Sequence, residues 1–221
     1  QTISSVAILN KDDKGSFGYL QIITKAKQYT YGIEDSEAVF NAVDVSHTPK
    51  GLSFAIQSDF GTAQINTHMI GHYNISNILA AFSAAVAGLG IDPEIAAQGV
   101  STVPGVSGRM EVIDMGQTFT AIVDFAHTPN ALKVALETLK TITNDNIWAV
   151  FGSAGLRDRE KRSMMGAVSA QYSDYSVFTA EDPLPETLDR ILVYKANDAL
   201  EEGAVEGKTF WRIRDRGDAI Q

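Results

Sequence analysis

The stretch Ile122–Gly155, IVDFAHTPNALKVALETLKTITNDNIWAVFGSAG, decides the fold class of this 221-residue chain. An apolar run ends near Asp124, Thr128-Pro129 has the chemistry of a helix start, and apolar residues then recur at helical spacing as far as Thr141. A second apolar run, Ile147–Phe151, follows and ends in small residues. Strand, helix and strand in this order are typical of a βαβ unit with parallel strands.

The same alternation continues on both sides of this stretch. The other elements expected in this region are strands at 110–114, 120–125, 175–179 and 209–213 and helices at 159–172 and 184–200. This pattern predicts an open, mostly parallel α/β sheet, whose ligands bind beyond the carboxyl ends of the strands.

Upstream of the break Pro104–Gly108 the pattern is different, and we place a domain boundary there. A small β-rich region with mixed or antiparallel pairing is predicted, followed by two helices, the second with Asp92 as its cap and Pro93 in its first turn. The expected elements are strands at 6–9, 29–33, 39–45, 52–56 and 63–70 and helices at 17–27, 74–89 and 93–100. The fold class is therefore α/β, with domains at residues 1–107 and 108–221.

The amino-acid composition indicates which kinds of partner the protein binds and in which cellular compartment it functions. The formal net charge is -9 and the sequence pI is about 4.9, which disfavours broad contact with nucleic acid or an anionic membrane. Cysteine is absent, which fits a reducing cytoplasm. No apolar run approaches the roughly 20 residues of a spanning helix. We therefore expect a cytoplasmic protein that binds neither nucleic acid nor membrane.

The first candidate site residue is Asn77, in the segment Gly71–Asn77, GHYNISN. Asn74 can cap the first turn of the expected helix, and Asn77 projects from the same face. The carboxamide of Asn77 offers a donor and an acceptor together, which suits the edge of an adenine. The alternative is that both asparagines only cap the helix or face solvent.

Three further candidates are polar residues at strand ends of the second domain. Arg109 opens the strand expected at 110–114, where its guanidinium could hold a phosphate or a nucleotide; the alternative is a surface salt bridge. Asp124 could accept hydrogen bonds from a ribose diol, with His127 at the mouth of the same crevice. The alternative is that Asp124 stabilises its own loop and that His127 is an ordinary polar residue.

The segment 151–162, FGSAGLRDREKR, joins a small-residue turn to a helix and is rich in positive charge. Four of the six residues from Arg157 to Arg162 are basic, which indicates a site for phosphate or carboxylate. It is not a Walker loop, because the G-x-x-x-x-G-K-[ST] spacing is absent here and elsewhere in the sequence. The alternative is a solvated helix start with internal ion pairs to Asp158 and Glu160.

Glu181 and Asp182 follow the next strand and precede the next helix. Two carboxylates facing one crevice could hold the ammonium group of a substrate, or they could simply favour the helix N-terminus. No set of His, Asp and Glu has metal-ligand spacing, and no G-x-S-x-G elbow is present. We therefore expect no metal ligands in this chain.

Read in order, six segments resemble the Mur ligase family, and within it the UDP-N-acetylmuramoyl-tripeptide synthetases. Any one of them is a weak match, but six in the same order are hard to obtain by chance. The segments are Ala7–Asp13, Tyr31–Ile33, Gly71–Asn77, Gly105–Glu111, Val123–Leu132 and Phe151–Arg162.

The resemblance implies part of a Mur ligase central domain, with a mixed sheet and helices, followed by a Rossmann-like carboxyl-terminal domain. It implies that Asn77 contacts adenine, that Arg109 and Asp124 hold the phosphate and ribose side of the nucleotide, and that His127 belongs to the same nucleotide-binding signature. Arg157 matches the arginine that grips the carboxylate of the incoming amino acid. The implied reaction is formation of an amide bond through an acyl phosphate, with ATP and Mg²⁺ as cofactors.

The family also places its G-T-x-G-K-[ST] loop, its acidic magnesium ligand and its modified lysine before the first residue of this chain, and its last strands after Gln221. The resemblance therefore implies an incomplete carboxyl-terminal domain, no catalytic residue in this chain, and a fragment that is inactive alone. Uncovered sheet edges and apolar surface predict that such a fragment self-associates.

Two local departures bear on the amino acid. The family's Gly-Asp-Arg-Asp is here Gly155-Leu-Arg-Asp158, and the Asp-Asn-Pro-Arg of diaminopimelate-adding members is here Glu181-Asp-Pro-Leu184. The lost arginine was the natural partner of a second carboxylate, whereas Glu181 and Asp182 favour a cationic side chain. The expected substrates are a UDP-muramoyl-dipeptide and lysine or ornithine.

Two rival functions stay open. Cyanophycin and folylpolyglutamate synthetases share the same arrangement of two domains. The chain could also be a nucleotide-binding or protein-interaction module that catalyses nothing.

Overall fold

The computed structural model describes residues 5–48, 51–155 and 159–221, and it describes no side chains for residues 159–161. The chain forms two compact units, Gln1–Val123 and Asp124–Gln221, and each is described by itself. In the described part of the chain, no helix is both long enough and apolar enough to cross a bilayer.

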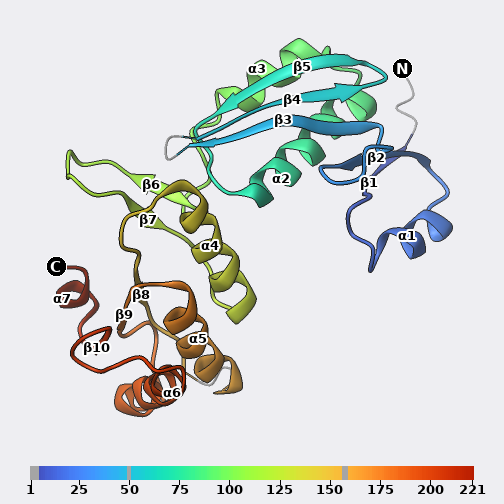
Figure 1. Ribbon diagram of the computed structural model, residues 1–221. Coiled ribbons are helices and arrows are strands. Elements are labelled where there is room, and N and C mark those ends of the chain that lie inside the picture. The colour runs from blue at the N-terminus through green and yellow to red at the C-terminus, as the bar shows by residue number, and fades with distance from the viewer. Residues whose placement is uncertain (1–4, 49–50, 156–158) are drawn as a thin grey trace. The chain divides into compact units, whose positions relative to one another are not determined.

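The first unit contains a five-stranded mixed sheet in the order β1-β2-β3-β4-β5 (Figure 1). Strands β1 to β3 are parallel to one another, and β3, β4 and β5 form antiparallel pairs. The prediction of a mixed sheet is confirmed. The strands are β1 (Val6–Asn10), β2 (Lys27–Gly32), β3 (Phe40–Thr48), β4 (Gly51–Ser58) and β5 (Gly61–Thr67).

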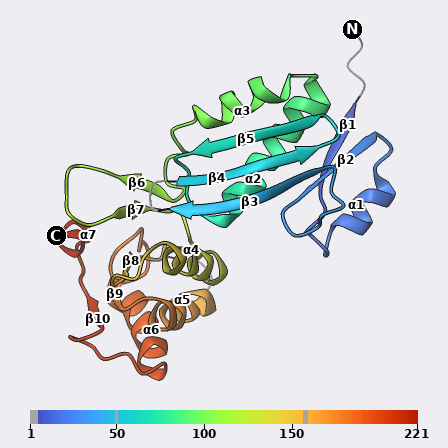
Figure 2. The same cartoon turned by 45° about the horizontal axis from the view of Figure 1, so that its top comes forward.

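Helices α2 (His72–Ser83) and α3 (Pro93–Ser101) cover one face of this sheet, as Figure 2 shows. A short π-helical turn (Ala84–Gly88) follows α2. Alternation along β4 explains which face is covered, since Phe54 and Ile56 are fully buried against the helices while Ser53 faces away and binds Asn66 of β5.

The end of α1 (Phe17–Ile23) and the start of α2 differ from the sequence prediction. Helix α1 ends before Lys27, because Lys27 starts β2 and pairs with Val6 of β1. Helix α2 begins two residues before Asn74, since Gly71 at φ 98° turns the chain into the helix from a conformation that suits glycine.

Strands β6 (Glu111–Ile113) and β7 (Ala121–Val123) form a two-stranded antiparallel sheet of their own. We expected both in the parallel sheet, and the structure corrects this. The short connection 114–120 contains no helix, and parallel neighbours need a crossover of about a dozen residues or more. The contacts of this hairpin place it with the first unit; domains at 1–107 and 108–221 remain our proposal.

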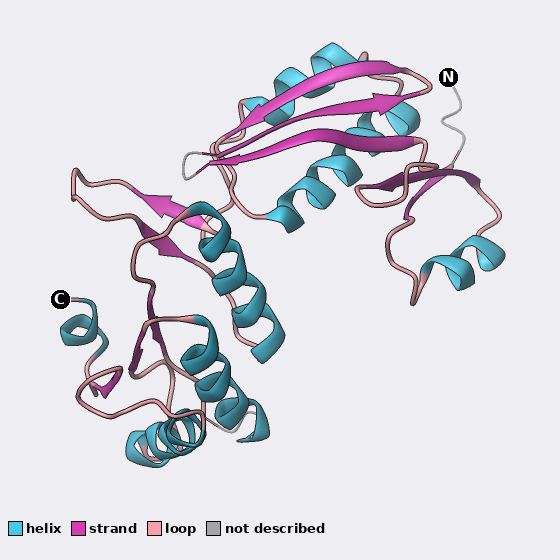
Figure 3. Ribbon diagram, in the orientation of Figure 1, coloured by secondary structure: helices cyan, strands magenta, loops and turns pink. Residues whose placement is uncertain are grey.

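The second unit has the expected alternation of strands and helices around a parallel sheet in the order β10-β9-β8 (Figure 3). The predicted α/β fold class is confirmed. Its elements are α4 (Pro129–Ile142), β8 (Trp148–Phe151), α5 (Arg159–Tyr172), β9 (Tyr175–Phe178), α6 (Leu188–Glu201), β10 (Phe210–Arg212) and α7 (Arg216–Ile220).

Helices α4, α5 and α6 supply one core on one face of this sheet, around Phe151, Phe178 and Phe210. Helices α5 and α6 approach closely at Gly166 of α5, where an added Cβ would lie 2.2 Å from the carbonyl oxygen of Lys195 in α6. The opposite face carries a cluster of three aromatic rings. Trp148 stacks on Tyr175 at 4.4 Å and on Trp211 at 5.5 Å between ring centroids, and Tyr175 and Trp211 are 6.1 Å apart.

Candidate functional site

Two loops of the second unit come together beyond the carboxyl ends of β8 and β9. The N–H of Gly155 donates a hydrogen bond to the carbonyl of Asp182 over 2.6 Å. A Cβ on Gly152 would lie 2.6 Å from the Cβ of Glu181, and one on Gly155 would lie 2.2 Å from the carbonyl of Pro183. Side chains at these two positions would push the loops apart, so the small-residue turn seen in the sequence is what lets them touch.

Arg162 of α5 lies beneath both loops, with 1% of its surface exposed. Its Nη1 is 2.7 Å from Oε2 of Glu186, and its Nη2 is 3.1 Å from Oε1 of the same residue. Nη2 also donates to the carbonyl of Ala154 over 3.1 Å. One buried guanidinium therefore contacts the turn after β8 and the loop after β9 at once.

Sequence reasoning missed this role of Arg162, which it counted among the basic residues of an anion site. The structure uses that charge for an internal ion pair. A signal was present, since Glu186 is an acidic residue in the second loop, directly before Thr187, the N-cap of α6. The pairing is not evident from the sequence because Arg162 and Glu186 are 24 residues apart.

Lys195 of α6 is a second buried cation near the same strand ends. The side chain is fully buried, and its Nζ lies 5.2 Å from the centre of the Phe151 ring. In the described part of the chain Nζ has no hydrogen-bond partner. Burial lowers the pKa of Lys195 to about 7, against the opposing influence of the Glu181 carboxylate, while Arg162 and Arg216 lower it further.

The two acidic candidates lie on the second of the two loops. The side chains of Glu181 and Asp182 are exposed, while their backbones meet Gly152 and Gly155. Exposed carboxylates on a held loop are available to a cationic ligand. Arg157, the expected partner of a carboxylate, lies outside the described residues.

Asp124 and His127 lie in the turn that leads into α4, whose N-cap Thr128 accepts a hydrogen bond from the N–H of Ala131. The carboxylate of Asp124 accepts a hydrogen bond from the N–H of Ala126 over 2.8 Å. Nδ1 of the exposed His127 is 3.1 Å from the carbonyl of Phe125. If Nδ1 carries the proton in that contact, Nε2 is the acceptor that His127 presents to solvent.

Asn77 and Arg109 belong to the first unit, and the structure corrects the role we expected for Asn74. Asn74 does not cap α2; it is buried in the first turn and donates to the carbonyl of Ile70 over 2.7 Å. Asn77 is exposed on the same face and donates to Oδ1 of Asn74 over 3.1 Å. This contact orients the carboxamide of Asn77, whose oxygen and second N–H have the pattern that an adenine edge requires.

Arg109 lies in a tight turn just before β6, not in the strand itself. Its N–H donates to the carbonyl of Val106 over 2.9 Å, and its neighbours Gly108 and Met110 have φ angles of 68° and 47°. The side chain is exposed. Asn77 and Arg109 thus lie on one compact unit, and Asp124, Glu181 and Asp182 on the other.

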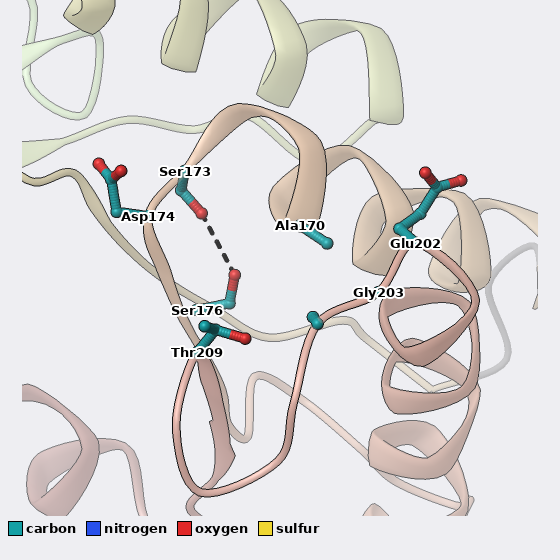
Figure 4. Close-up of a pocket in the computed structure, with 8 residues that line it drawn as sticks. Ala170, Ser173, Asp174, Ser176, Glu202, Gly203 and Thr209 are labelled. Atoms are coloured by element: carbon teal, nitrogen blue, oxygen red, sulfur yellow. Dashed lines mark hydrogen bonds between the residues drawn. The ribbon is translucent and has the colours of Figure 1, made fainter.

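A pocket of about 150 Å³ lies at the opposite, amino-terminal end of β9 (Figure 4). Two of its lining hydroxyl groups, those of Ser173 and Ser176, are 3.2 Å apart. The hydroxyl of Ser176 is also 2.6 Å from that of Ser169, and Ser173 donates to the carbonyl of Ser169 over 2.7 Å. No residue predicted from the sequence lines it. Because these hydroxyls have partners, the pocket carries no ligand assignment.

Across residues 5–48, 51–155 and 159–221, no group of three or more His, Cys, Asp or Glu side chains is placed to hold a metal ion. The candidate residues of the first unit carry an amide and a guanidinium group, and those described in the second unit carry carboxylates and an imidazole.

Comparison with known proteins gives matches over both units. A family profile described as "Mur ligase, glutamate ligase domain" matches residues 108–221, and one described as "Mur ligase middle domain" matches residues 1–85. A UDP-N-acetylmuramoyl-L-alanyl-D-glutamate--2,6-diaminopimelate ligase of Geobacillus thermodenitrificans is 38% identical over 97% of this chain and 42% of its own length. A UDP-N-acetylmuramyl-tripeptide synthetase of a Roseiflexus species is 36% identical over 98% of this chain and 42% of its own length.

Solved structures show the same fold. A UDP-N-acetylmuramoyl-L-alanyl-D-glutamate--2,6-diaminopimelate ligase aligns with a TM-score of 0.65 and 30% identity, over 98% of this chain and 44% of its own. The folylpolyglutamate synthase of Mycobacterium tuberculosis, solved with ADP, aligns with a TM-score of 0.76 and 16% identity, over 97% of this chain and 46% of its own. The chain thus spans less than half the length of these relatives.

Proposed function

The chain belongs to the Mur ligase family, and we propose that it acts as part of a cytoplasmic, ATP-dependent ligase that adds an amino acid to UDP-N-acetylmuramoyl-dipeptide. The observation that carries this proposal is the 38% identity to a diaminopimelate ligase over 97% of the chain. The meeting of the turn after β8 and the acidic loop after β9 supports it, because this edge is where ligands of such sheets bind.

We propose a division of roles between the two units. In the first, the carboxamide of Asn77 binds the adenine edge and Arg109 neutralises phosphate. In the second, Asp124 and His127 bind the ribose side of the nucleotide, Arg157 binds the carboxylate of the amino acid, and Glu181 and Asp182 bind its cationic end. When bound, ATP and Mg²⁺ would supply the phosphoryl group and the charge neutralisation that activate the peptide carboxylate.

Leu184 is the position that supports a particular amino acid. Diaminopimelate carries a second carboxylate, and the exposed Leu184 offers it no charge. Glu181 and Asp182 are exposed carboxylates that suit the terminal ammonium group of lysine or ornithine. We therefore propose lysine or ornithine as the amino acid, and diaminopimelate, the substrate in the names of several relatives, as the alternative.

The test is amino-acid-dependent phosphate release by the full-length protein with UDP-N-acetylmuramoyl-dipeptide. We expect kcat/KM for lysine or ornithine to exceed that for diaminopimelate by roughly tenfold or more, since an unpartnered carboxylate in a closed site costs at least about 1.4 kcal/mol. Leu184→Arg should move the preference toward diaminopimelate, whereas Leu200→Arg, an exposed leucine late in α6, should leave it unchanged.

Several outcomes would contradict these assignments. A wild-type preference for diaminopimelate would reject the cationic amino acid, and release that depends on a folate substrate would reject the muramoyl acceptor. The 221-residue chain assayed alone should release no phosphate, because its sequence contains no G-x-x-x-x-G-K-[ST] loop. Turnover by this chain alone would show that the loop is dispensable.

We also propose that the 221-residue chain self-associates when it is produced alone. Trp148 is 55% exposed and Val150 is 37% exposed on the face of β8 opposite the helices, beside the stacked rings of Tyr175 and Trp211. Such an apolar face favours contact with a second copy. Light scattering should give a mass above one chain, and Trp148→Lys should lower it; a monomer at every concentration would refute the proposal.

A further inference from the structure

The ion pair of Arg162 with Glu186 joins three parts of the second unit that are far apart in the sequence. The guanidinium comes from α5, Glu186 from the end of the loop after β9, and the carbonyl of Ala154 from the turn after β8. Side-chain exposure is 1% for Arg162 and 9% for Glu186. The two terminal nitrogens of the guanidinium therefore hold both loops from the protein interior, where water does not compete for these hydrogen bonds.

The other contacts described between these loops involve the backbone. The N–H of Gly155 donates to the carbonyl of Asp182, and Gly152 and Gly155 lie close to Glu181 and Pro183. Neither glycine has a side chain that could pack across the junction. The N–H of Glu186 donates to the carbonyl of Pro183 over 2.8 Å. The loop therefore forms a turn at Glu186, the residue that pairs with Arg162.

Stability alone is a poor explanation for a buried ion pair at this position. Two charges taken out of water lose their hydration, and well-packed apolar side chains of similar volume are often as stabilising or more so. An apolar pair could not, however, hold the carbonyl of Ala154 or set the spacing of the two loops. The geometry that the ion pair supplies is thus its distinctive contribution.

We propose that Arg162 is a positioning residue for the amino-acid subsite: paired with Glu186, it holds the loop 179–187 against the turn 152–155 and so presents Glu181 and Asp182 to the incoming amino acid. This inference rests on the proposed ligase function. Arg162 is buried and touches no substrate, so its effect acts through the placement of the two exposed carboxylates.

The test uses the double variant Arg162→Met with Glu186→Leu in the full-length protein. Both charges are removed together because either one left alone in the interior would strongly destabilise the unit for reasons unrelated to positioning. The KM for the amino acid should rise by roughly tenfold to a hundredfold, as expected when binding groups move by about 1 Å. The KM for ATP and the KM for the UDP-muramoyl substrate should change by less than about twofold.

The matched control is Arg212→Met with Glu206→Leu. This pair is also forked, with contacts of 2.7 and 2.9 Å made through Nε and Nη2, but it is partly exposed and joins residues on either side of one short connection. It should leave all three KM values unchanged. Arg162→Lys should resemble the double variant, because an ammonium group cannot make the forked contact.

Amide hydrogen exchange in the same proteins, without substrates, gives a second and independent readout. The double variant should exchange faster than wild type in peptides covering 152–155 and 179–187, with the rest of the unit unchanged. If the double variant exchanges faster but its amino-acid KM is unchanged, Arg162 does not position the amino-acid subsite. If its exchange is unchanged, the ion pair does not hold the two loops together. If the wild type shows no amino-acid-dependent phosphate release, the ligase function fails, and exchange still decides whether Arg162 holds the loops.

Discussion

Replacing Lys195 with methionine is expected to raise the free energy of unfolding of the second unit at pH 7, by at most about 5 kcal/mol. The ammonium is fully buried without a hydrogen-bond partner in the described part of the chain, and burial lowers its pKa from 10.5 to about 7. Each unit of displaced pKa corresponds to about 1.4 kcal/mol of differential interaction, which sets the upper limit. Methionine has a similar length and no charge to bury.

The stabilising effect should depend on pH in a defined direction. Between pH 7 and about 10.5 the unfolded lysine binds a proton that the folded one has released, so the stability of the wild type rises with pH across this window. Below pH 7 the lysine is charged in both states and the full cost of burial is present. The advantage of Lys195→Met is therefore largest at and below pH 7 and declines toward pH 10.

The charged groups around Lys195 bear on the size of this effect. Arg162 and Arg216 repel the ammonium, and Glu181 attracts it.

The measurement is urea unfolding followed by tryptophan fluorescence from pH 6 to 10. Both tryptophans of the chain, Trp148 and Trp211, lie in the second unit, so the signal reports on that unit.

Lys208→Met is the matched control, because Lys208 is exposed in the same unit. It should change the free energy of unfolding by less than about 0.5 kcal/mol at any of these pH values. Equal stability of wild type and Lys195→Met at pH 7 would show that the interior accommodates the charge, and the pH argument would be wrong.

Replacing Gly166 with alanine should destabilise the second unit by about 3 kcal/mol, the upper part of the range for overpacked interiors. The new Cβ would lie 2.2 Å from the carbonyl oxygen and 2.9 Å from the Cα of Lys195, both of them backbone atoms of α6. A backbone cannot rotate away as a side chain can, so the two helices must separate. Arg162 lies on one of these helices and Lys195 on the other. We therefore expect the loops that follow β8 and β9 to be displaced when the helices separate.

The matched control is Gly99→Ala in α3, where an added Cβ would meet no atom within 4 Å. There the same change should stabilise the first unit by about 0.5 to 1 kcal/mol, since alanine favours a helix. Urea unfolding followed by tryptophan fluorescence serves for Gly166→Ala, and circular dichroism serves for Gly99→Ala. A loss below 1 kcal/mol at Gly166 would mean that α5 and α6 slide apart easily.

The limits of prediction from the sequence are visible at particular residues. Periodicity placed α5 at 159–172 as the structure has it, because helical spacing is a property of neighbouring residues. The helix predicted at 17–27 was too long, because the pairing of Lys27 with Val6 overrides local preference. The strands predicted at 110–114 and 120–125 lie close to β6 and β7. They pair with each other in an antiparallel sheet, however, and not with the strands of the parallel sheet.

The candidate site shows the same division. Glu181 and Asp182 were singled out because acidic residues follow a strand, and the structure leaves their side chains exposed on a loop at the sheet edge. Arg162 was assigned to an anion site, whereas the structure pairs it with Glu186, 24 residues later in the chain. Nothing in the sequence marks Lys195 as buried, since a lysine in an amphipathic helix is usually exposed.

The sequence by itself determined the α/β class, the approximate order of strands and helices, and the Mur ligase family, because composition, spacing and motif order are all written along the chain. Tertiary structure alone decided that the turn at Gly152–Gly155 meets the loop at Glu181, that Arg162 forms a buried ion pair with Glu186, and that Nζ of Lys195 is buried without a hydrogen-bond partner among the described residues. Those properties arise from atoms brought within a few ångströms of one another by folding and from the water excluded between them, and neither is encoded in the spacing of neighbouring residues.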